Sequence, residues 1–225
     1  MPALRLAHRG DWRDAPENSL DAMLAALRGP NCDGLEFDVR SSADGVAVLL
    51  HDETLARVQK IPAKCVTLTA EQLAEHGIPT LAQVLAKVDC EYFLDVELKE
   101  PVQGAIDALE LERSRVDDDG RSELRNAVFS AFEVKTLRWL ADTRPTWPRW
   151  LNAYDLSRAT IDTALALGCE AISAEWQSID AEGMARASDA GLRVGAWTVR
   201  SVTDYKVLEE LGVAAICVEA AALDG

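Results

Sequence analysis

The chain has no hydrophobic run long enough to cross a membrane, and it is short of basic residues. None of its apolar runs approaches the ~20 residues that a membrane-spanning helix needs. After Met1-Pro2 an apolar strand pattern begins at once, without the basic and hydrophobic regions of a signal peptide. There are 23 Lys and Arg against 38 Asp and Glu, a net charge of −15. This balance argues against nucleic acid or an anionic membrane as partner. We therefore expect a cytoplasmic protein without integral membrane association.

Cysteine is scarce and follows no binding pattern. The count is odd and no CxxC occurs, which argues against a disulfide framework or a zinc knuckle. We expect reduced thiols at all five positions, which are Cys32, Cys65, Cys90, Cys169 and Cys217. The chain also lacks a P-loop, a Rossmann fingerprint and a nucleophile elbow. Since it has no linker or low-complexity segment, we expect residues 1–225 to form one domain.

Strand and helix patterns alternate along the whole chain. The expected strands are residues 4–8, 34–39, 92–98, 126–131, 149–153, 171–174, 192–199 and 213–218. Alternation implies parallel strands with crossover helices, and a count of eight at this length predicts an α/β fold of the (β/α)₈ TIM barrel type. An Asp-Gly turn before residues 46–50 predicts a hairpin-like extension of the second strand. A short insertion with one helix, at residues 69–75, follows it.

Charged residues interrupt the apolar strands where the strands end. Glu36 and Asp38 close the second strand, and Glu97 and Lys99 close the third. Residues i and i+2 share one face of a strand about 6.6–7 Å apart, so each pair points in one direction. The carboxyl ends of barrel strands are where active sites lie. The pattern therefore predicts a site at this end of the barrel.

Three converging carboxylates need a counter-charge. Glu36, Asp38 and Glu97 would repel one another in a buried setting, and hard divalent ions such as Mg²⁺ or Ca²⁺ prefer oxygen ligands. We therefore expect a divalent cation at these three residues. The alternative is ion pairing with nearby cations, for which the sequence offers Arg9, Arg40 and Lys99.

Two histidines accompany the carboxylates. A lone histidine on a strand is usually a core residue, but His8 and His51 each end a strand and each precede a charged residue, Arg9 or Asp52. Beside a metal, such a pair suits hydrolysis of a phosphodiester, with one histidine taking a proton and the other giving one. Arg9 and Lys99 would bind the phosphoryl oxygens.

Two other features allow more than one interpretation. Trp197 is expected to face inward near the end of the seventh strand, as barrel packing or as an aromatic wall for a substrate. Residues 117–120 read Asp-Asp-Asp-Gly, which we interpret as a solvated turn and not a calcium loop, because the spaced ligands and the distal Glu are missing.

Several motifs occur together and in a characteristic order. They are Ala7-His8-Arg9-Gly10, Pro16-Glu17-Asn18-Ser19, Leu35-Glu36-Phe37-Asp38-Val39, Asp44-Gly45, His51-Asp52, Leu55 with Arg57, Ile78-Pro79-Thr80-Leu81, Val96-Glu97-Leu98-Lys99 and Trp197-Thr198-Val199. With these motifs in this order, the chain resembles the glycerophosphodiester phosphodiesterase family. The resemblance implies a (β/α)₈ barrel and a divalent-cation-dependent hydrolase that cleaves glycerophosphodiesters to glycerol 3-phosphate and an alcohol.

The resemblance also implies roles for individual residues. His8 and His51 match the acid–base pair, and the metal ligands match Glu36, Asp38 and Glu97. Substrate-contacting positions match Arg9, Lys99 and Trp197. Supporting positions match Glu17, which would hold the loop after His8, Asn18, which would cap the following helix, and Asp52.

The chain departs from the family pattern at several places. Ser41-Ser42-Ala43 precede the Asp-Gly turn where the family usually has Thr, and Val58-Gln59 follow Arg57 where Thr is common. The last strand end reads Cys217-Val218-Glu219-Ala220 where the family usually has a Thr-Asp pair after the apolar run, and the segment between His51 and Ile78 is short. We expect these changes to leave the catalytic set intact and to alter the rim, and with it the choice of alcohol. The attacking oxygen could belong to a metal-activated water or to a neighbouring hydroxyl of the substrate, which would give a cyclic phosphate.

Two other functions remain to be weighed. One is a phospholipase C- or D-like barrel acting on lipid phosphodiesters, which the acidic charge and the missing amphipathic anchor disfavour. The other is a barrel that binds phosphate esters without hydrolysing them, which the complete set of histidines, carboxylates and lysine disfavours.

Overall fold

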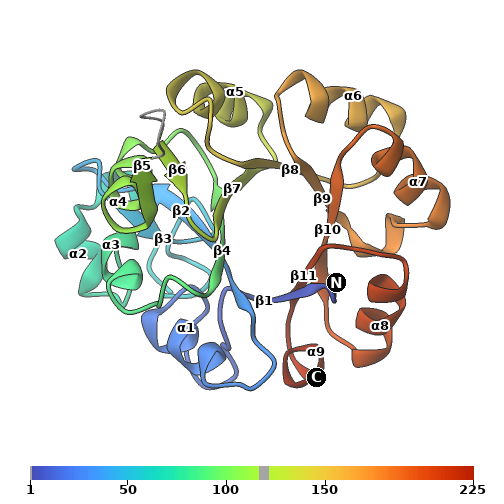
Figure 1. Cartoon of the computed structure of the whole chain (residues 1–225). Helices are drawn as coiled ribbons and strands as arrows, with labels where there is room; N and C mark the ends of the chain where they lie inside the picture. Colours follow the sequence, from blue (N-terminus) through green and yellow to red (C-terminus); the bar gives the residue numbers. More distant parts are fainter. Residues whose placement is uncertain (1, 117–121) are drawn as a thin grey trace.

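Eight parallel strands close into a barrel in the computed structural model, which describes residues 2–116 and 122–225 (Figure 1). Closure is complete because β1 pairs with both β2 and β11. The barrel strands are β1 (Leu4–His8), β2 (Gly34–Ser41), β4 (Phe93–Leu98), β7 (Ala127–Ala131), β8 (Arg149–Ala153), β9 (Ala171–Glu175), β10 (Arg193–Val199) and β11 (Ala215–Val218). The predicted (β/α)₈ barrel is confirmed.

In the described part of the chain, three short strands lie outside the barrel. β3 (Ala47–Leu49) pairs antiparallel with the end of β2, as the Asp-Gly turn predicted. β5 (Ser114–Val116) and β6 (Ser122–Leu124) form a small hairpin where only a polar turn was expected. The acidic segment 117–120 lies outside the described residues, so its interpretation as a solvated turn stays a prediction.

Helices surround the ring of strands (Figure 1). They are α1 (Leu20–Leu27), α2 (Ala70–Ala74), α3 (Leu81–Leu85), α4 (Gln103–Arg113), α5 (Val134–Thr143), α6 (Arg158–Ala166), α7 (Ala181–Asp189), α8 (Val202–Glu210) and α9 (Ala221–Asp224). Side-chain caps fix several of their starts; Thr69 and Thr80 each form a reciprocal capping box with a glutamine three residues later. Two single turns of 3₁₀ helix, Cys65–Thr67 and Trp176–Ser178, complete the elements.

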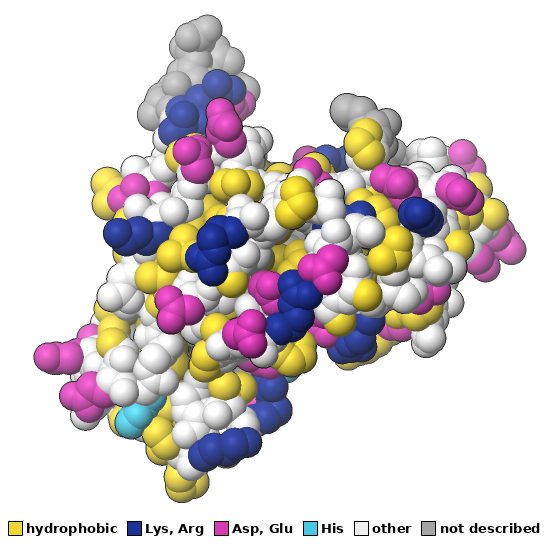
Figure 2. Space-filling view, turned by 90° about the horizontal axis from the view of Figure 1, so that it is seen from below, with side chains coloured by type: hydrophobic (Ala, Val, Ile, Leu, Met, Phe, Trp, Pro, Cys, Tyr) yellow, Lys and Arg dark blue, Asp and Glu magenta, His cyan; other side chains and the backbone are white. Residues whose placement is uncertain are grey.

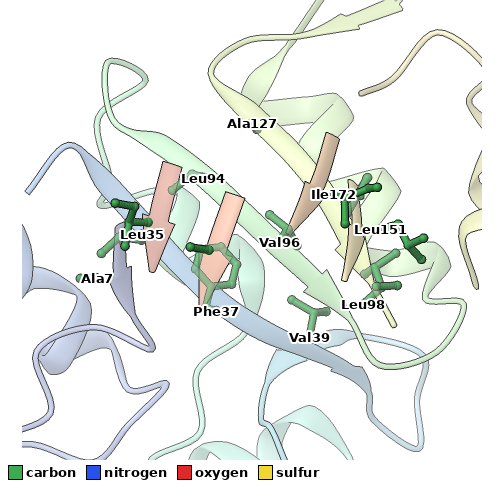
Figure 3. Close-up of a cluster of buried hydrophobic side chains, with 14 of the residues drawn as sticks. Ala7, Leu35, Phe37, Val39, Leu94, Val96, Leu98, Ala127, Leu151 and Ile172 are labelled. Atoms are coloured by element: carbon green, nitrogen blue, oxygen red, sulfur yellow. The ribbon is translucent and has the colours of Figure 1, made fainter. Parts of the chain in front are cut away.

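The larger core lies between the strands and the helices. Figure 3 shows alternate residues of β2 and β4 on this side, among them Leu35, Phe37, Val96 and Leu98, and all four are buried. Side chains alternate along a strand, so the residues between them face the barrel interior. The outward apolar residues of β2 and β4 therefore direct the carboxylates of the same strands into the barrel.

The barrel interior changes character along its axis. Toward the amino ends of the strands it is filled by apolar side chains, including Leu6, Val128, Trp150 and Ala171. Two residues further along three of these strands the inward positions are polar and still buried, namely Ser130, Asn152 and Ser173. One end of the barrel is thus closed by a small core, and the other end carries polar groups.

Charge is interspersed on the molecular surface. On the face seen in Figure 2, acidic, basic and hydrophobic side chains alternate over short distances. Within residues 2–116 and 122–225, no helix combines the length and apolar character needed to cross a membrane. With 38 acidic against 23 basic residues in the chain, binding of an anionic substrate depends on cations inside the site.

Candidate active site at the carboxyl ends of the barrel strands

A cavity of about 500 Å³ opens at the polar end of the barrel. Its lining includes eight of the predicted site residues: His8, Arg9, Glu17, Glu36, His51, Glu97, Lys99 and Trp197. The other three lie directly behind it, with Asp38 against Arg9, Asp52 against His51 and Asn18 against Asp38. The fold thus brings predicted site residues between His8 on β1 and Trp197 on β10 together at one cavity.

Glu36, Asp38 and Glu97 form a compact cluster of buried carboxylates. One oxygen from each lies within 4.8 Å of the others. Their spacing follows from the sheet, because Asp38 on β2 is in register with Glu97 on β4. The expectation that all three close their strands is only partly right, since β2 continues to Ser41 in order to pair with β3. Glu36 and Asp38 therefore project from the middle of a strand, which makes their positions rigid.

Burial and mutual repulsion shape the ionisation of this cluster. Burial, and then the charge of Asp38, raises the pKa of both Glu36 and Glu97. Burial also opposes ionisation of Asp38, but Lys99 and Arg9 outweigh it and hold the pKa of Asp38 well below its usual range. Asp38 is thus a fixed anion, and its two glutamate neighbours are harder to ionise than ordinary glutamates unless more positive charge arrives.

Two cations already lie against the cluster. Lys99 Nζ is 2.7 Å from Asp38 Oδ1 and also contacts Glu97, while Arg9 Nε is 3.0 Å from Asp38 Oδ2. Ion pairing, the alternative to a metal, therefore accounts for Asp38 and Glu97. It leaves Glu36 Oε2 as a buried oxygen without a hydrogen bond among the described residues.

Asp95 is a fourth buried carboxyl group, which the sequence argument did not single out. It lies two residues before Glu97 on β4 and is in register with Glu36 on β2. Burial, and then the neighbouring Glu97 and Asp38, raises the pKa of Asp95 to about 7. Its position could have been found from the sequence, because residues 95, 97 and 99 share one face of the strand.

The donor set fits a divalent cation. Of the lysines and arginines in the described residues, only Arg9 and Lys99 form ion pairs with the four buried carboxyl groups on β2 and β4, which are Glu36, Asp38, Asp95 and Glu97. The free oxygen of Glu36 and the all-oxygen character of the three clustered ligands are what hard divalent cations require.

His51 lies two residues beyond β3 and not on a strand. Its Nδ1 is 2.7 Å from Asp52 Oδ1, and Arg57 Nε holds the other oxygen of Asp52 at 2.6 Å. Arg40, expected as a partner for the clustered carboxylates, instead donates to the carbonyl of His51 at 3.0 Å and pairs with Glu100. Burial lowers the pKa of His51, so its imidazole is neutral at pH 7.

Glu17 links the two loops that carry the cationic residues. It accepts from Arg9 Nη1 at 3.0 Å and from Arg57 Nη1 and Nη2 at 2.9 and 2.5 Å. The chain of contacts from Arg9 through Glu17 and Arg57 to Asp52 ends at His51. Glu17 thus holds Arg9, the residue after His8, and its position is compatible with the supporting role that the resemblance implies.

Asn18 does not cap α1, contrary to the sequence expectation. Ser19 is the cap, accepting from the backbone amide of Ala22. Asn18 instead donates to Asp38 Oδ2 at 2.8 Å and accepts from the backbone amide of Asp38 at 3.2 Å. It therefore holds a carboxylate of the cluster in place from the start of α1.

His8, at the end of β1, lies between two carboxylates. Its Nε2 is 3.7 Å from Glu36 Oε2, and its Nδ1 is 2.5 Å from Glu219 Oε1. Arg200 Nε holds the other oxygen of Glu219 at 2.8 Å. Glu219 was expected at the rim, but it is buried against His8. The sequence contains the information, since Glu219 follows the last strand, which neighbours β1 in a closed barrel.

An aromatic cluster lines the same cavity as Glu36 and Glu97. Trp197 contacts Phe132 and Tyr154, with ring centroids 5.4 and 5.6 Å apart, and all three line the cavity. Trp197 Nε1 also donates to the carbonyl of Ser173 at 2.9 Å. Trp197 therefore both packs against the barrel and lines the cavity, and its role as an aromatic wall for a substrate stays a prediction. Phe132 and Tyr154 were not expected.

Comparison with known proteins identifies the family. The profile of the glycerophosphoryl diester phosphodiesterase family matches residues 8–223. The chain belongs to this family. A probable glycerophosphodiester phosphodiesterase 1 from Mycobacterium tuberculosis is 31% identical over 248 residues, covering 93% of this chain and 86% of that protein. The chain is therefore a phosphodiesterase of this family.

A second named phosphodiesterase matches over a shorter stretch. A glycerophosphodiester phosphodiesterase from Caldanaerobacter subterraneus is 32% identical over 113 residues, which covers 44% of this chain and 46% of that protein. Among solved structures, a phosphodiesterase from Oleispira antarctica in complex with the product sn-glycerol-3-phosphate superimposes with a TM-score of 0.82 at 22% identity, covering 96% of this chain and 93% of the other. This structural likeness supports the barrel fold.

Proposed function

We propose that this phosphodiesterase hydrolyses glycerophosphodiesters to glycerol 3-phosphate and an alcohol. The carrying observation is one cavity that combines a three-carboxylate cluster, two cationic side chains and two histidines, each backed by a carboxylate. The family match supports the reaction class. The product sn-glycerol-3-phosphate bound to the Oleispira antarctica phosphodiesterase supports the choice of a glycerol phosphate substrate.

The two histidines provide the proton transfers in this proposal. His51 is neutral at pH 7 because burial lowers its pKa, which suits a base that takes the proton of the attacking oxygen. His8, which must enter this step with a hydrogen on both ring nitrogens, then gives the Nε2 proton to the leaving alkoxide as the P–O bond to the alcohol breaks and the bond to the attacking oxygen forms, and it keeps the Nδ1 hydrogen that bonds to Glu219. Both rings are held by carboxylates at Nδ1, which leaves Nε2 free for the reacting groups.

The remaining residues would bind the metal, the phosphate group and the carbon atoms of the substrate. Glu36, Asp38 and Glu97 would hold Mg²⁺ or Ca²⁺, which would stabilise negative charge on the phosphoryl oxygens. Arg9 and Lys99 stay charged, since the pKa of each is raised, and they present donors to the same oxygens. The aromatic cluster of Phe132, Tyr154 and Trp197 offers an apolar surface for carbon atoms of the substrate.

The test is a substrate panel with and without metal. Protein treated with a chelator and then supplied with Mg²⁺ or Ca²⁺ is incubated with glycerophosphocholine, glycerophosphoethanolamine and glycerophosphoglycerol, and glycerol 3-phosphate is measured. We expect turnover only with metal and a loss of at least about 100-fold in the His8→Ala and His51→Ala variants. Turnover that survives in both variants would refute the acid–base roles.

The same panel tests the alternatives. Phosphatidylcholine vesicles as substrate test a lipid-directed enzyme, and tight binding of glycerophosphodiesters without turnover would indicate a binding barrel. The attacking oxygen is identified by ³¹P NMR during the reaction: a transient cyclic phosphate indicates attack by the neighbouring hydroxyl of the substrate, and its absence under single-turnover conditions indicates water.

A further inference from the structure

Two His–carboxylate–Arg groups of the same design face the cavity. In the first, His51 Nδ1 contacts Asp52 at 2.7 Å, and Arg57 holds the second oxygen of Asp52 at 2.6 Å. In the second, His8 Nδ1 contacts Glu219 at 2.5 Å, and Arg200 Nε holds the second oxygen of Glu219. The family resemblance assigned a supporting role to Asp52 and none to Glu219 or Arg200. In both groups the carboxylate contacts Nδ1 of the histidine with one oxygen and an arginine with the other.

The surroundings of Glu219 favour a carboxylate that accepts a proton from the ring of His8. Glu219 is buried, which by itself opposes ionisation, but His8 and Arg200 outweigh burial and keep the pKa of Glu219 below its usual value. Because an ionised carboxylate can only accept, Nδ1 of His8 must carry the hydrogen. Nε2 of His8, which lies toward Glu36, is then the atom that exchanges protons with a substrate.

The backbone at this contact is strained. Arg9, directly after His8, has φ 59°, and Ala220, directly after Glu219, has φ 51°. Neither is glycine, and side chains other than glycine rarely adopt a positive φ. Strain of this kind persists where the surrounding structure fixes a functional geometry.

We propose that Glu219 is the positioning residue for His8, fixing its tautomer and the direction of Nε2, with Arg200 fixing the carboxylate in turn. The inference rests on the proposed function, in which His8 gives a proton to the leaving alkoxide. The two residues are 211 positions apart, so this half of the acid–base pair is assembled only when β11 closes the barrel against β1. The departure from Thr-Asp at the last strand therefore belongs to the proton-transfer machinery and not to the rim.

The first experiment is ¹⁵N NMR of the histidine rings at pH 8, which needs no substrate. In the unmodified protein we expect His8 with its hydrogen on Nδ1. In Glu219→Gln the amide oxygen turns to Arg200, the amide NH₂ faces His8, and the hydrogen moves to Nε2. Glu210→Gln, an exposed position on α8, is the matched control and should leave the spectrum of His8 unchanged. An Nε2–H tautomer in the unmodified protein would overturn the inference without any variant.

The second experiment separates positioning from folding. We expect Glu219→Gln to lower kcat about 100-fold with KM within about threefold, and Glu219→Asp to recover part of the loss because it restores a carboxylate. A fall in kcat with an unchanged His8 tautomer would refute the positioning role. If the unmodified protein shows the expected tautomer but hydrolyses no glycerophosphodiester, the proposed function fails and the positioning of His8 stands.

Discussion

Several of the predicted site residues are held by specific neighbours. Asp38 is the clearest case, because Asn18, Arg9 and Lys99 all bind its carboxylate. A residue fixed from three sides keeps its charge and its direction, whereas Glu36 retains an oxygen without a hydrogen bond. At the residue scale, the cluster is thus one firmly held anion with two glutamates that a cation would complete.

The pH dependence of catalysis tests the base assigned to His51. Burial lowers the pKa of His51 below its usual value of about 6.5, and a bound divalent cation acts in the same direction. Since the neutral ring is the active form, kcat/KM should be level near neutrality and should fall on acidification with a midpoint below about 6.5. The measurement is kcat/KM for glycerophosphocholine from pH 5 to 8 at saturating metal.

Asp52→Asn is the matched change for that profile. The hydrogen bond that His51 donates to Asp52 raises the pKa of His51, so its loss should move the acid limb to still lower pH and reduce the maximal rate. An acid limb centred above pH 7 in the unmodified protein, or one that moves upward in Asp52→Asn, would contradict the assignment of His51 as base.

At the scale of elements, the loop between β1 and α1 positions His8 and Arg9. Gly10 has φ +82°, and a Cβ atom at this position would lie 2.5 Å from the backbone carbon of Ala22 in α1. Gly191, after α7, has a similar φ of +75° but open space around it. An alanine at Gly191 would meet only backbone strain, whereas an alanine at Gly10 would meet the same strain and a steric clash with α1.

We expect Gly10→Ala to be far more costly than Gly191→Ala. The strain common to both is about 1 kcal/mol, and the clash with α1 should add about 1–3 kcal/mol at Gly10 alone. Urea unfolding measures both changes, and kcat should fall only in Gly10→Ala because its loop carries His8 and Arg9. Equal destabilisation of the two variants would show that the contact with α1 does not constrain the loop.

The elements that were predictable from the sequence are those set by local pattern. Alternating apolar segments gave all eight barrel strands, and i, i+2 spacing placed Glu36 with Asp38 and Glu97 with Lys99 on common faces. Helix caps were less certain where two capable residues are adjacent: Ser19 took the cap, and Asn18 was drawn to Asp38. Local pattern cannot decide between such neighbours, since a tertiary contact makes the choice.

Contacts between distant elements were not predictable in the same way. Glu219 meets His8 only because the last strand lies beside the first, and the inward face of β4 adds Asp95 beneath Glu97. Each strand end taken by itself predicts Glu219 at the rim, whereas closure of the barrel places it beside His8.

For the whole molecule, the buried carboxyl groups of the site make the free energy of unfolding depend on pH and on bound metal. Burial raises the pKa of Asp95 to about 7 and also raises the pKa values of Glu36 and Glu97, so the folded metal-free protein holds protons that the unfolded chain releases above about pH 4. These groups make the free energy of unfolding fall as pH rises from about 4 to 7. The lowered pKa of His51 acts in the opposite sense near pH 6, so the carboxyl contribution has to be isolated by substitution.

Asp95→Asn isolates that contribution. In metal-free protein the variant should gain stability over the unmodified protein as pH rises from 4.5 to 7.5, by at most ~4 kcal/mol at the upper end, because one pKa unit corresponds to about 1.4 kcal/mol. With saturating Mg²⁺ or Ca²⁺ the gain should shrink, because the cation takes over the role of the retained protons. Melting temperatures of both proteins across this pH range, with chelator and with metal, provide the measurement. A stability difference that is independent of pH, or that metal leaves unchanged, would mean that Asp95 is not electrostatically coupled to a cation at Glu36, Asp38 and Glu97.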